Sequence, residues 1–106
     1  PALLENNFSD TVNKTLLLYQ NGMTLEAIAK ERGFVISTVQ SHLSEAIEAG
    51  MLKAKDVLGL SDDDISLIEN MAESLNSAEE QVLKPLYMAL EERWDYGVLR
   101  CVVAGM

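Results

Sequence analysis

Hydrophobic residues recur every three or four positions along most of the chain, and no stretch alternates polar and apolar residues over a useful length. The first spacing places apolar side chains on one face of an α-helix, whereas alternation is typical of a strand. The sequence therefore predicts an all-α fold, a bundle of about six helices with no clear β-wing.

Capping residues and stop signals bound the individual helices. We expect a first helix from Ser9 or Asp10 to the Asn21-Gly22 stop, two helices spanning 24–50, and a short helix from Lys55 to Leu58. A further helix is expected to open at Ser61, followed by a turn or short helix from Ser77 to Leu83. The last two helices are one with Pro85 in its first turn and one capped by Asp95.

Residues 24–43 have the spacing of a helix-turn-helix motif. Thr24 is a good N-cap, and Ile28 and Ala29 belong to the apolar stripe of a short helix. Gly33 follows a charged last turn, where a helix ends in left-handed geometry that glycine adopts easily. A motif of this kind places its second helix in a DNA groove.

The second helix of the motif is predicted to open at Ser37, because Ser37 and Gln40 have the spacing of a capping box. Residues 34–36 supply apolar side chains for the turn, and Gly50 ends the helix. A plain helical hairpin can share this spacing, but the agreement of all these signals favours a true helix-turn-helix. The residues expected to face inward are Val39, Leu43, Ala46 and Ile47.

Charge divides the chain into two unequal halves. Residues 1–60 contain seven acidic and five basic residues, a net charge of −2, and residues 61–106 contain ten acidic and three basic residues, a net charge of −7. A DNA-binding domain that acts alone normally has a basic face, and this chain has no obvious one. The motif is therefore expected to bind DNA weakly and without sequence preference.

The chain of 106 residues has the size of one domain. We expect residues 1–8 to be a linker from upstream domains and residues 9–106 to form the helix-turn-helix domain, with an acidic helical extension at 61–106. Pro1 stands where an initiator methionine would be, which indicates a piece of a longer protein or a processed N-terminus.

The residue combinations of an enzyme are missing from the sequence. His42 and Cys101 are the only histidine and the only cysteine, too few for a zinc cluster or a catalytic pair. We expect His42 to be partly buried and hydrogen-bonded, with a phosphate contact as the alternative, and Cys101 to be buried. The acidic residues at 62–64 are expected at a helix N-terminus, where the helix dipole favours negative charge, and not in a metal site. The sequence also contains no glycine-rich loop of the kind that binds phosphates. The fragment is therefore predicted to have no catalytic, cofactor or metal site.

Candidate DNA contacts lie on the motif helices and on the basic residues around them. Glu45 and Glu48 would repel the DNA backbone unless the second helix enters only by its N-terminal turn. Hydroxyl, amide and cationic side chains can bond phosphates or base edges. The candidates are Thr24, Lys30, Arg32, Ser37, Thr38, Gln40, Ser41, Ser44, Lys53 and Lys55, of which Thr38, Gln40, Ser41 and Ser44 are expected to point outward from the second helix.

A set of residues spread over most of the chain has the pattern of a known family. These residues are Thr15-Leu16, Tyr19, Gly22 to Ala29, Arg32-Gly33, Ser37 to Val39, His42-Leu43, Ala49-Gly50, Leu83 to Leu86 and Asp95 to Arg100. With the order of elements over residues 9 to 106, they resemble the helix-turn-helix domain at the C-terminus of RecQ-type DNA helicases. That resemblance implies a parent enzyme with an ATP-driven motor, which would bind ATP and Mg²⁺ outside this fragment. It also implies a cytoplasmic protein at the bacterial nucleoid, active in DNA unwinding, repair and recombination.

Two other interpretations remain open. A LuxR-type transcription regulator has a similar local pattern around Thr38-Val39 and His42-Leu43, although it usually carries a basic residue where this chain has Gln40. Alternatively, the acidic half makes the chain a protein-interaction module that docks on a basic surface, such as the core of its own parent.

Overall fold

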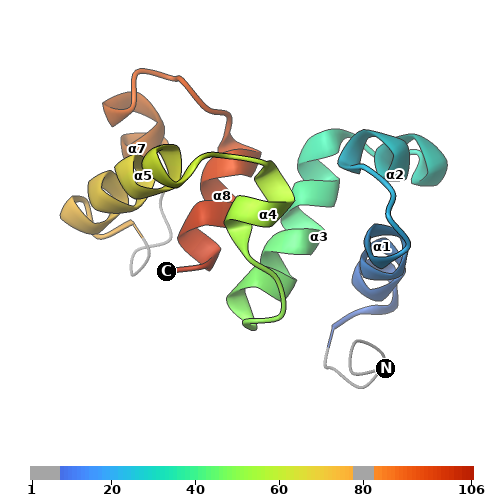
Figure 1. The fold of residues 1–106 in the computed structure, drawn as a ribbon. Helices are drawn as coiled ribbons and strands as arrows, with labels where there is room; N and C mark the ends of the chain where they lie inside the picture. Colours follow the sequence, from blue (N-terminus) through green and yellow to red (C-terminus); the bar gives the residue numbers. More distant parts are fainter. Residues whose placement is uncertain (1–7, 78–82) are drawn as a thin grey trace.

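The computed structural model describes residues 8–77 and 83–106, and these residues form seven α-helices and no strand. The all-α prediction is confirmed. Figure 1 shows α3 and α8 side by side in the middle, with α1 and α2 on one side and α5 and α7 on the other. The helices are α1 (Asp10–Gln20), α2 (Leu25–Arg32), α3 (Ile36–Glu48), α4 (Ala54–Leu58), α5 (Asp62–Ser74), α7 (Lys84–Ala89) and α8 (Tyr96–Ala104).

Four helices begin at side-chain caps, as the sequence predicts. Ser9, Thr24, Ser61 and Asp95 each accept a hydrogen bond from the backbone N–H three residues later, at 3.4, 3.1, 3.1 and 3.0 Å. Each bond satisfies one of the amides that a helix N-terminus leaves without a partner. Pro85 lies in the first turn of α7, where a missing N–H costs nothing.

The turn between α2 and α3 depends on Gly33. Its φ of 70° and ψ of 32° place it in the left-handed region, and the next amide, of Phe34, donates to the carbonyl of Ala29 at 2.8 Å. This bond closes the last turn of α2 and directs the chain into α3. The turn is only partly filled by apolar side chains, because Val35 is 66% exposed.

The predicted start of α3 is wrong. The helix begins at Ile36, after Val35 in extended geometry, so Ser37 is already inside the first turn and cannot cap it. No side chain caps this N-terminus. The capping-box spacing of Ser37 and Gln40 therefore has no capping role.

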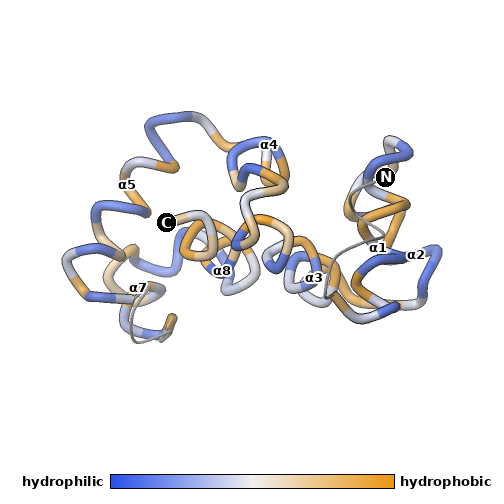
Figure 2. Tube along the Cα trace, turned by 90° about the horizontal axis from the view of Figure 1, so that it is seen from below, coloured by the Kyte–Doolittle hydropathy of each residue, from blue (hydrophilic) through white to orange (hydrophobic). Residues whose placement is uncertain are grey.

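Two hydrophobic clusters stabilise the fold, and α8 belongs to both. The first contains residues from α1 to α4 together with Cys101 of α8, and the second contains residues from α5, α7 and the other face of α8. Figure 2 shows α8 as a mostly hydrophobic segment between these groups of helices. The buried apolar residues are Val12, Leu16, Ile28, Ala29, Val39, Leu43, Ala46, Ile47, Val57 and Cys101 in the first cluster, and Ile68, Ala72, Leu86, Leu90, Leu99 and Val102 in the second.

Small residues let α8 pack closely along α3. Gly97 lies against the side chain of Gln40, the Cys101 thiol donates to the Gln40 carbonyl at 3.3 Å, and a Cβ on Gly105 would be only 3.2 Å from Ile47. Gly97, Cys101 and Gly105 are four residues apart and follow the same order as their neighbours on α3. The two helices are therefore parallel, and their N-termini lie at the same end.

Two predictions concern segments outside the described residues. Residues 1–7 of the linker expected over 1–8, and residues 78–82 of the turn or short helix expected from Ser77 to Leu83, lie outside the described residues. Phe8, the last residue of the expected linker, packs against the first cluster. None of the helices in the described ranges has the length and hydropathy that a membrane crossing requires.

Candidate nucleic-acid interface

The exposed face of α3 is narrow and changes character along its length. Its N-terminal half presents the hydroxyl side chains of Ser37, Thr38 and Ser41, and its C-terminal half presents the carboxylates of Glu45 and Glu48. Only the N-terminal half is therefore suited to meeting a polyanion.

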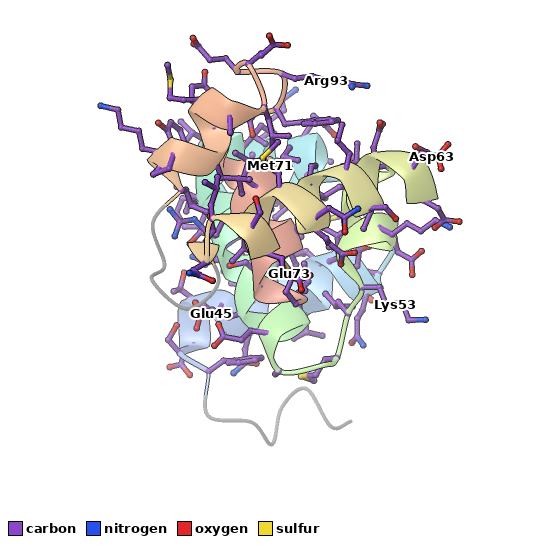
Figure 3. The ribbon with its side chains drawn as sticks, turned by 90° about the vertical axis from the view of Figure 1, so that its left-hand side faces the viewer. Glu45, Lys53, Asp63, Met71, Glu73 and Arg93 are labelled. Atoms are coloured by element: carbon purple, nitrogen blue, oxygen red, sulfur yellow. The ribbon has the colours of Figure 1, made fainter. Side chains whose placement is uncertain are left out.

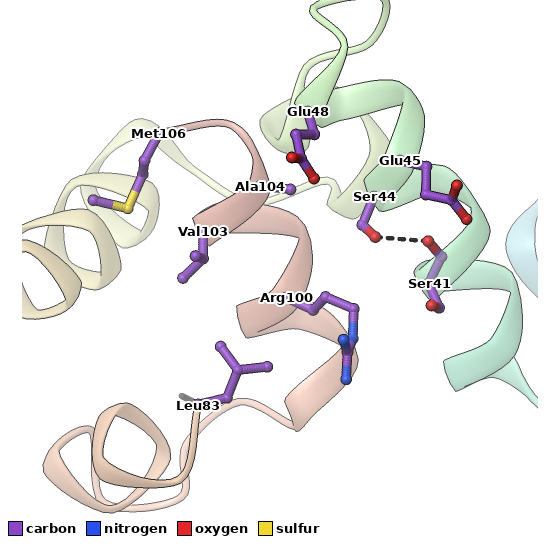
Figure 4. Close-up of a pocket in the computed structure, with 9 residues that line it drawn as sticks. All are labelled: Ser41, Ser44, Glu45, Glu48, Leu83, Arg100, Val103, Ala104 and Met106. Atoms are coloured by element: carbon purple, nitrogen blue, oxygen red, sulfur yellow. Dashed lines mark hydrogen bonds between the residues drawn. The ribbon is translucent and has the colours of Figure 1, made fainter. Parts of the chain in front are cut away.

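Gln40 and Ser44 do not belong to this face, which corrects the expectation that they point outward. Their side chains are only 6% exposed, because α8 covers that flank of α3. The Ser44 hydroxyl donates to the Ser41 carbonyl at 2.6 Å (Figure 4). Both side chains are therefore part of the α3–α8 packing.

The N-terminus of α3 adds a favourable partial charge to this half. Its first amides receive no side-chain cap, and the peptide dipoles of a helix give its N-terminus a positive potential. Anionic groups such as phosphates are commonly bound at such an end. The N-terminus of the parallel helix α8 lies nearby, although its own Asp95 caps it.

Arg100 lies beside the hydroxyl side chains of α3, and it is not among the candidates that the sequence suggests. Together with Tyr96 it lines a hollow of about 250 Å³ whose other wall is Ser37, Thr38 and Ser41. Its guanidinium makes no hydrogen bond or ion pair with any residue that the structure describes. The sequence signal was weak, because Arg100 is separated from the motif by more than fifty residues and reaches it only through the packing of α8.

A second, larger hollow lies next to it, between the C-terminal halves of α3 and α8 (Figure 4). Arg100 stands at one end of this hollow, and Glu45 and Glu48 stand along it. Val103 and Met106 supply apolar lining. The acidic side chains make this second hollow unsuited to nucleic acid.

Arg32 is a structural residue of the motif in this arrangement. Its guanidinium donates to the carbonyl of Thr11 at 2.6 Å and to the hydroxyl of Thr15 at 2.6 Å, and it stacks over the Phe34 ring at 4.7 Å. The Thr15 hydroxyl in turn lies 2.8 Å from Nδ1 of His42. This network joins α1, α2 and α3 and leaves Arg32 little freedom to reach a phosphate.

The expected environment of His42 is confirmed: the ring is partly buried and hydrogen-bonded. Burial is the main cause that lowers its pKa, and the nearby Arg32 guanidinium lowers the pKa further, while Glu45 opposes them. The neutral ring is therefore favoured, and it adds no positive charge for DNA.

The remaining basic candidates lie at different places. Lys30 is exposed in the last turn of α2, near the motif turn, and Thr24 is exposed at the other end of α2, where it caps the helix. Lys55 pairs with Asp62 at 2.8 Å. Figure 3 shows Lys53 on the side of the molecule opposite Glu45, and thus away from the exposed face of α3. The ten candidates consequently do not form one surface.

The described residues contain no group of three or more potential metal-ligating side chains. The Cys101 thiol is buried, as expected, and burial raises its pKa to about 12. A thiol in this environment stays protonated and acts as a small core residue.

Residues 11–103 match a protein family described as a helix-turn-helix domain. The chain belongs to this family. No curated protein and no solved structure matches it. The match covers α4, α5, α7 and nearly all of α8 as well as the first three helices, so the family includes the acidic helices together with the motif.

Proposed function

We propose that this chain is an accessory DNA-binding domain of a RecQ-type DNA helicase, contributing to DNA unwinding, repair and recombination. The helix-turn-helix family supports the DNA-binding part. The resemblance over residues 9–106 supports the parent, whose motor domains would bind ATP and Mg²⁺ outside this fragment.

One observation carries the DNA-binding part of the proposal. The exposed face of α3 is free of acidic residues only in its N-terminal half, where three hydroxyl side chains adjoin the uncapped helix end and the unpaired Arg100. In the proposed complex, Ser37, Thr38 and Ser41 bond phosphate oxygens or base edges. Arg100 and the exposed α2 residues Thr24 and Lys30 supply the other backbone contacts.

This surface is small, so binding is expected to be weak. Few cations are placed to release counterions from DNA, and Glu45 and Glu48 keep the rest of α3 away from the backbone. We expect a Kd in the non-specific range of ~10⁻⁴ to 10⁻⁶ M at physiological salt. The domain would then act together with a stronger DNA-binding partner in the same protein.

Fluorescence anisotropy with labelled DNA, repeated over a range of salt concentrations, tests this proposal. Ser37→Glu places a carboxylate in the first turn of α3, which the helix dipole tolerates, but costs about fivefold in DNA affinity by phosphate repulsion. The matched control is Ser66→Glu, which adds the same charge to an exposed position of α5. Equal effects of the two substitutions would contradict the assigned surface.

Two other results would contradict the accessory role itself. Nanomolar, sequence-dependent binding at physiological salt would favour a LuxR-like regulator. Absence of DNA binding, together with binding to a purified helicase core, would favour the protein-interaction module. The parent is tested independently by reading the coding sequence upstream of Pro1, where we expect a helicase motor with a phosphate-binding loop.

A further inference from the structure

We propose that the hollow between the N-terminal ends of α3 and α8 binds single-stranded DNA, with a base stacked on Tyr96 and a backbone phosphate on Arg100. This inference rests on the proposed function and names the form of DNA that the same surface prefers.

Tyr96 provides a firm platform for a base. Its side chain is 41% exposed, and it forms part of the hollow. The ring of Tyr87 from α7 stacks on one of its faces, with ring centroids 4.5 Å apart and planes inclined by 22°. Because Tyr87 covers one face, a base would stack on the other. Aromatic rings presented in this way bind successive bases of a single strand with little sequence preference.

Arg100 is the arginine that remains available for a phosphate. Arg32 is held by Thr11 and Thr15, and Arg93 pairs with Asp64 at 3.3 Å and stacks over Trp94 at 4.4 Å. Arg100 has no such partner among the described residues. It lies one helical turn after Tyr96 on α8, so both side chains reach the same hollow.

No acidic side chain is among the residues that line the hollow. The hydroxyls of Ser37, Thr38 and Ser41 come from α3 and can bond base edges or sugar oxygens. Acids do lie around the hollow: Asp95 precedes Tyr96 and caps α8, and Glu92 is hydrogen-bonded to Tyr87 behind the Tyr96 ring. These carboxylates weaken the attraction for a phosphate, so the binding expected here is weak.

A duplex fits this surface less well than a single strand does. The major groove of DNA is about 12 Å wide and an α-helix with its side chains is about 10 to 12 Å across, so an inserted helix leaves little room for a second helix on its flank. Here α8 covers one flank of α3, and Glu45 and Glu48 occupy the C-terminal part of the exposed face. A single strand needs only a ring, a cation and a few hydrogen-bonding groups, all of which the hollow has.

The test compares a labelled oligo(dT) strand with a duplex of the same length, using the whole chain and one salt concentration. We expect tighter binding of the single strand. Tyr96→Leu should weaken that binding about fivefold or more, since one stacked base is lost, while Tyr96→Phe keeps the ring and should change it less than twofold. Arg100→Gln should lower the slope of log K against log salt by about 0.7 for the single strand.

Lys53→Gln is the matched control for loss of one positive charge, because Lys53 lies on the opposite side of the molecule (Figure 3). Circular dichroism and the thermal midpoint verify that each variant is folded. Equal affinity for strand and duplex, or a Tyr96→Leu variant that binds like the original, would overturn this inference alone. Absence of binding to both forms of DNA would overturn the proposed function as well.

Discussion

The two halves of the molecule differ in how their helices are held together. In the motif half, a partly buried polar network of Thr15, Arg32 and His42 joins α1, α2 and α3 beside the apolar cluster. In the acidic half, α5, α7 and α8 meet through apolar side chains, and the ion pairs Lys55–Asp62 and Arg93–Asp64 lie at the N-terminus of α5. Directional bonds fix angles between helices more sharply than apolar contacts do, so the motif half is the more precisely defined one.

The two halves therefore have different parts in the proposed DNA-binding surface. The motif must present α3 at one orientation, and the network defines that orientation. The acidic half must mainly supply α8, which seals one flank of α3 and contributes Arg100 and Tyr96 to its exposed end. The acidic half is thus a part of the proposed DNA-binding surface and not merely an extension of it.

The largest expected effect tests whether the halves form one folding unit. Leu16 and Leu86 are equivalent probes, because they are 1% and 0% exposed in the first and second clusters. Leu16→Ala and Leu86→Ala should each lower the free energy of unfolding by about 2 to 5 kcal/mol. Because α8 spans both clusters, each variant should still show a single transition in urea, followed by circular dichroism and by Trp94 fluorescence. Separate midpoints for the two probes would show that the halves unfold independently.

A smaller effect is expected at the contact between the halves. Cys101 fills the space between α8 and the Gln40 carbonyl of α3, with Gly97 and Gly105 one turn away on either side. Cys101→Leu should lower the free energy of unfolding by about 1 to 3 kcal/mol, because the larger side chain pushes α8 off α3. Cys101→Ser, which keeps the size and a donor for Gln40, is the matched control. Similar losses for the two variants would contradict the close-packing argument.

Local features of the fold could be predicted from the sequence, and contacts between distant segments could not. Thr24, Ser61 and Asp95 were predicted as caps because a cap bonds an amide only three residues away. Gly33 was predicted for the same reason, since its turn depends on local backbone geometry. The prediction of Ser37 as the cap of α3 is wrong, because the spacing of a capping box does not show at which residue the helical backbone begins.

The burial of Gln40 and Ser44 could not be predicted from the motif alone. Their cover is α8, more than fifty residues later in the chain, and both residues would face outward if the motif stood alone. The four-residue spacing of Gly97, Cys101 and Gly105 was the signal that could have revealed a closely packed face. The same long-range packing brings Arg100 to the candidate site, which explains why the sequence did not identify it.

The smallest effect concerns the network that distinguishes the motif half. Arg32 can only donate, so the Thr15 hydroxyl accepts from Arg32, and the same hydroxyl either donates to Nδ1 of His42 or accepts from it, according to the tautomer of the ring. Protonation of His42 would place a second positive charge near Arg32. Burial and Arg32 accordingly hold the pKa of His42 below its ordinary value of 6.5.

The sign of the pH dependence follows from that lowered pKa. Below pH 6.5 the unfolded chain binds a proton at His42 more readily than the folded chain does, so the free energy of unfolding should fall as the pH decreases from 6.5 toward the folded pKa. Urea titrations at pH 7.5 and 5.5 measure the fall, and His42→Gln removes the titrating ring while leaving every carboxylate in place. We expect a smaller fall for His42→Gln than for the original chain. An equal fall would assign the pH dependence to the carboxylates and would remove His42 from the features that set the motif half apart.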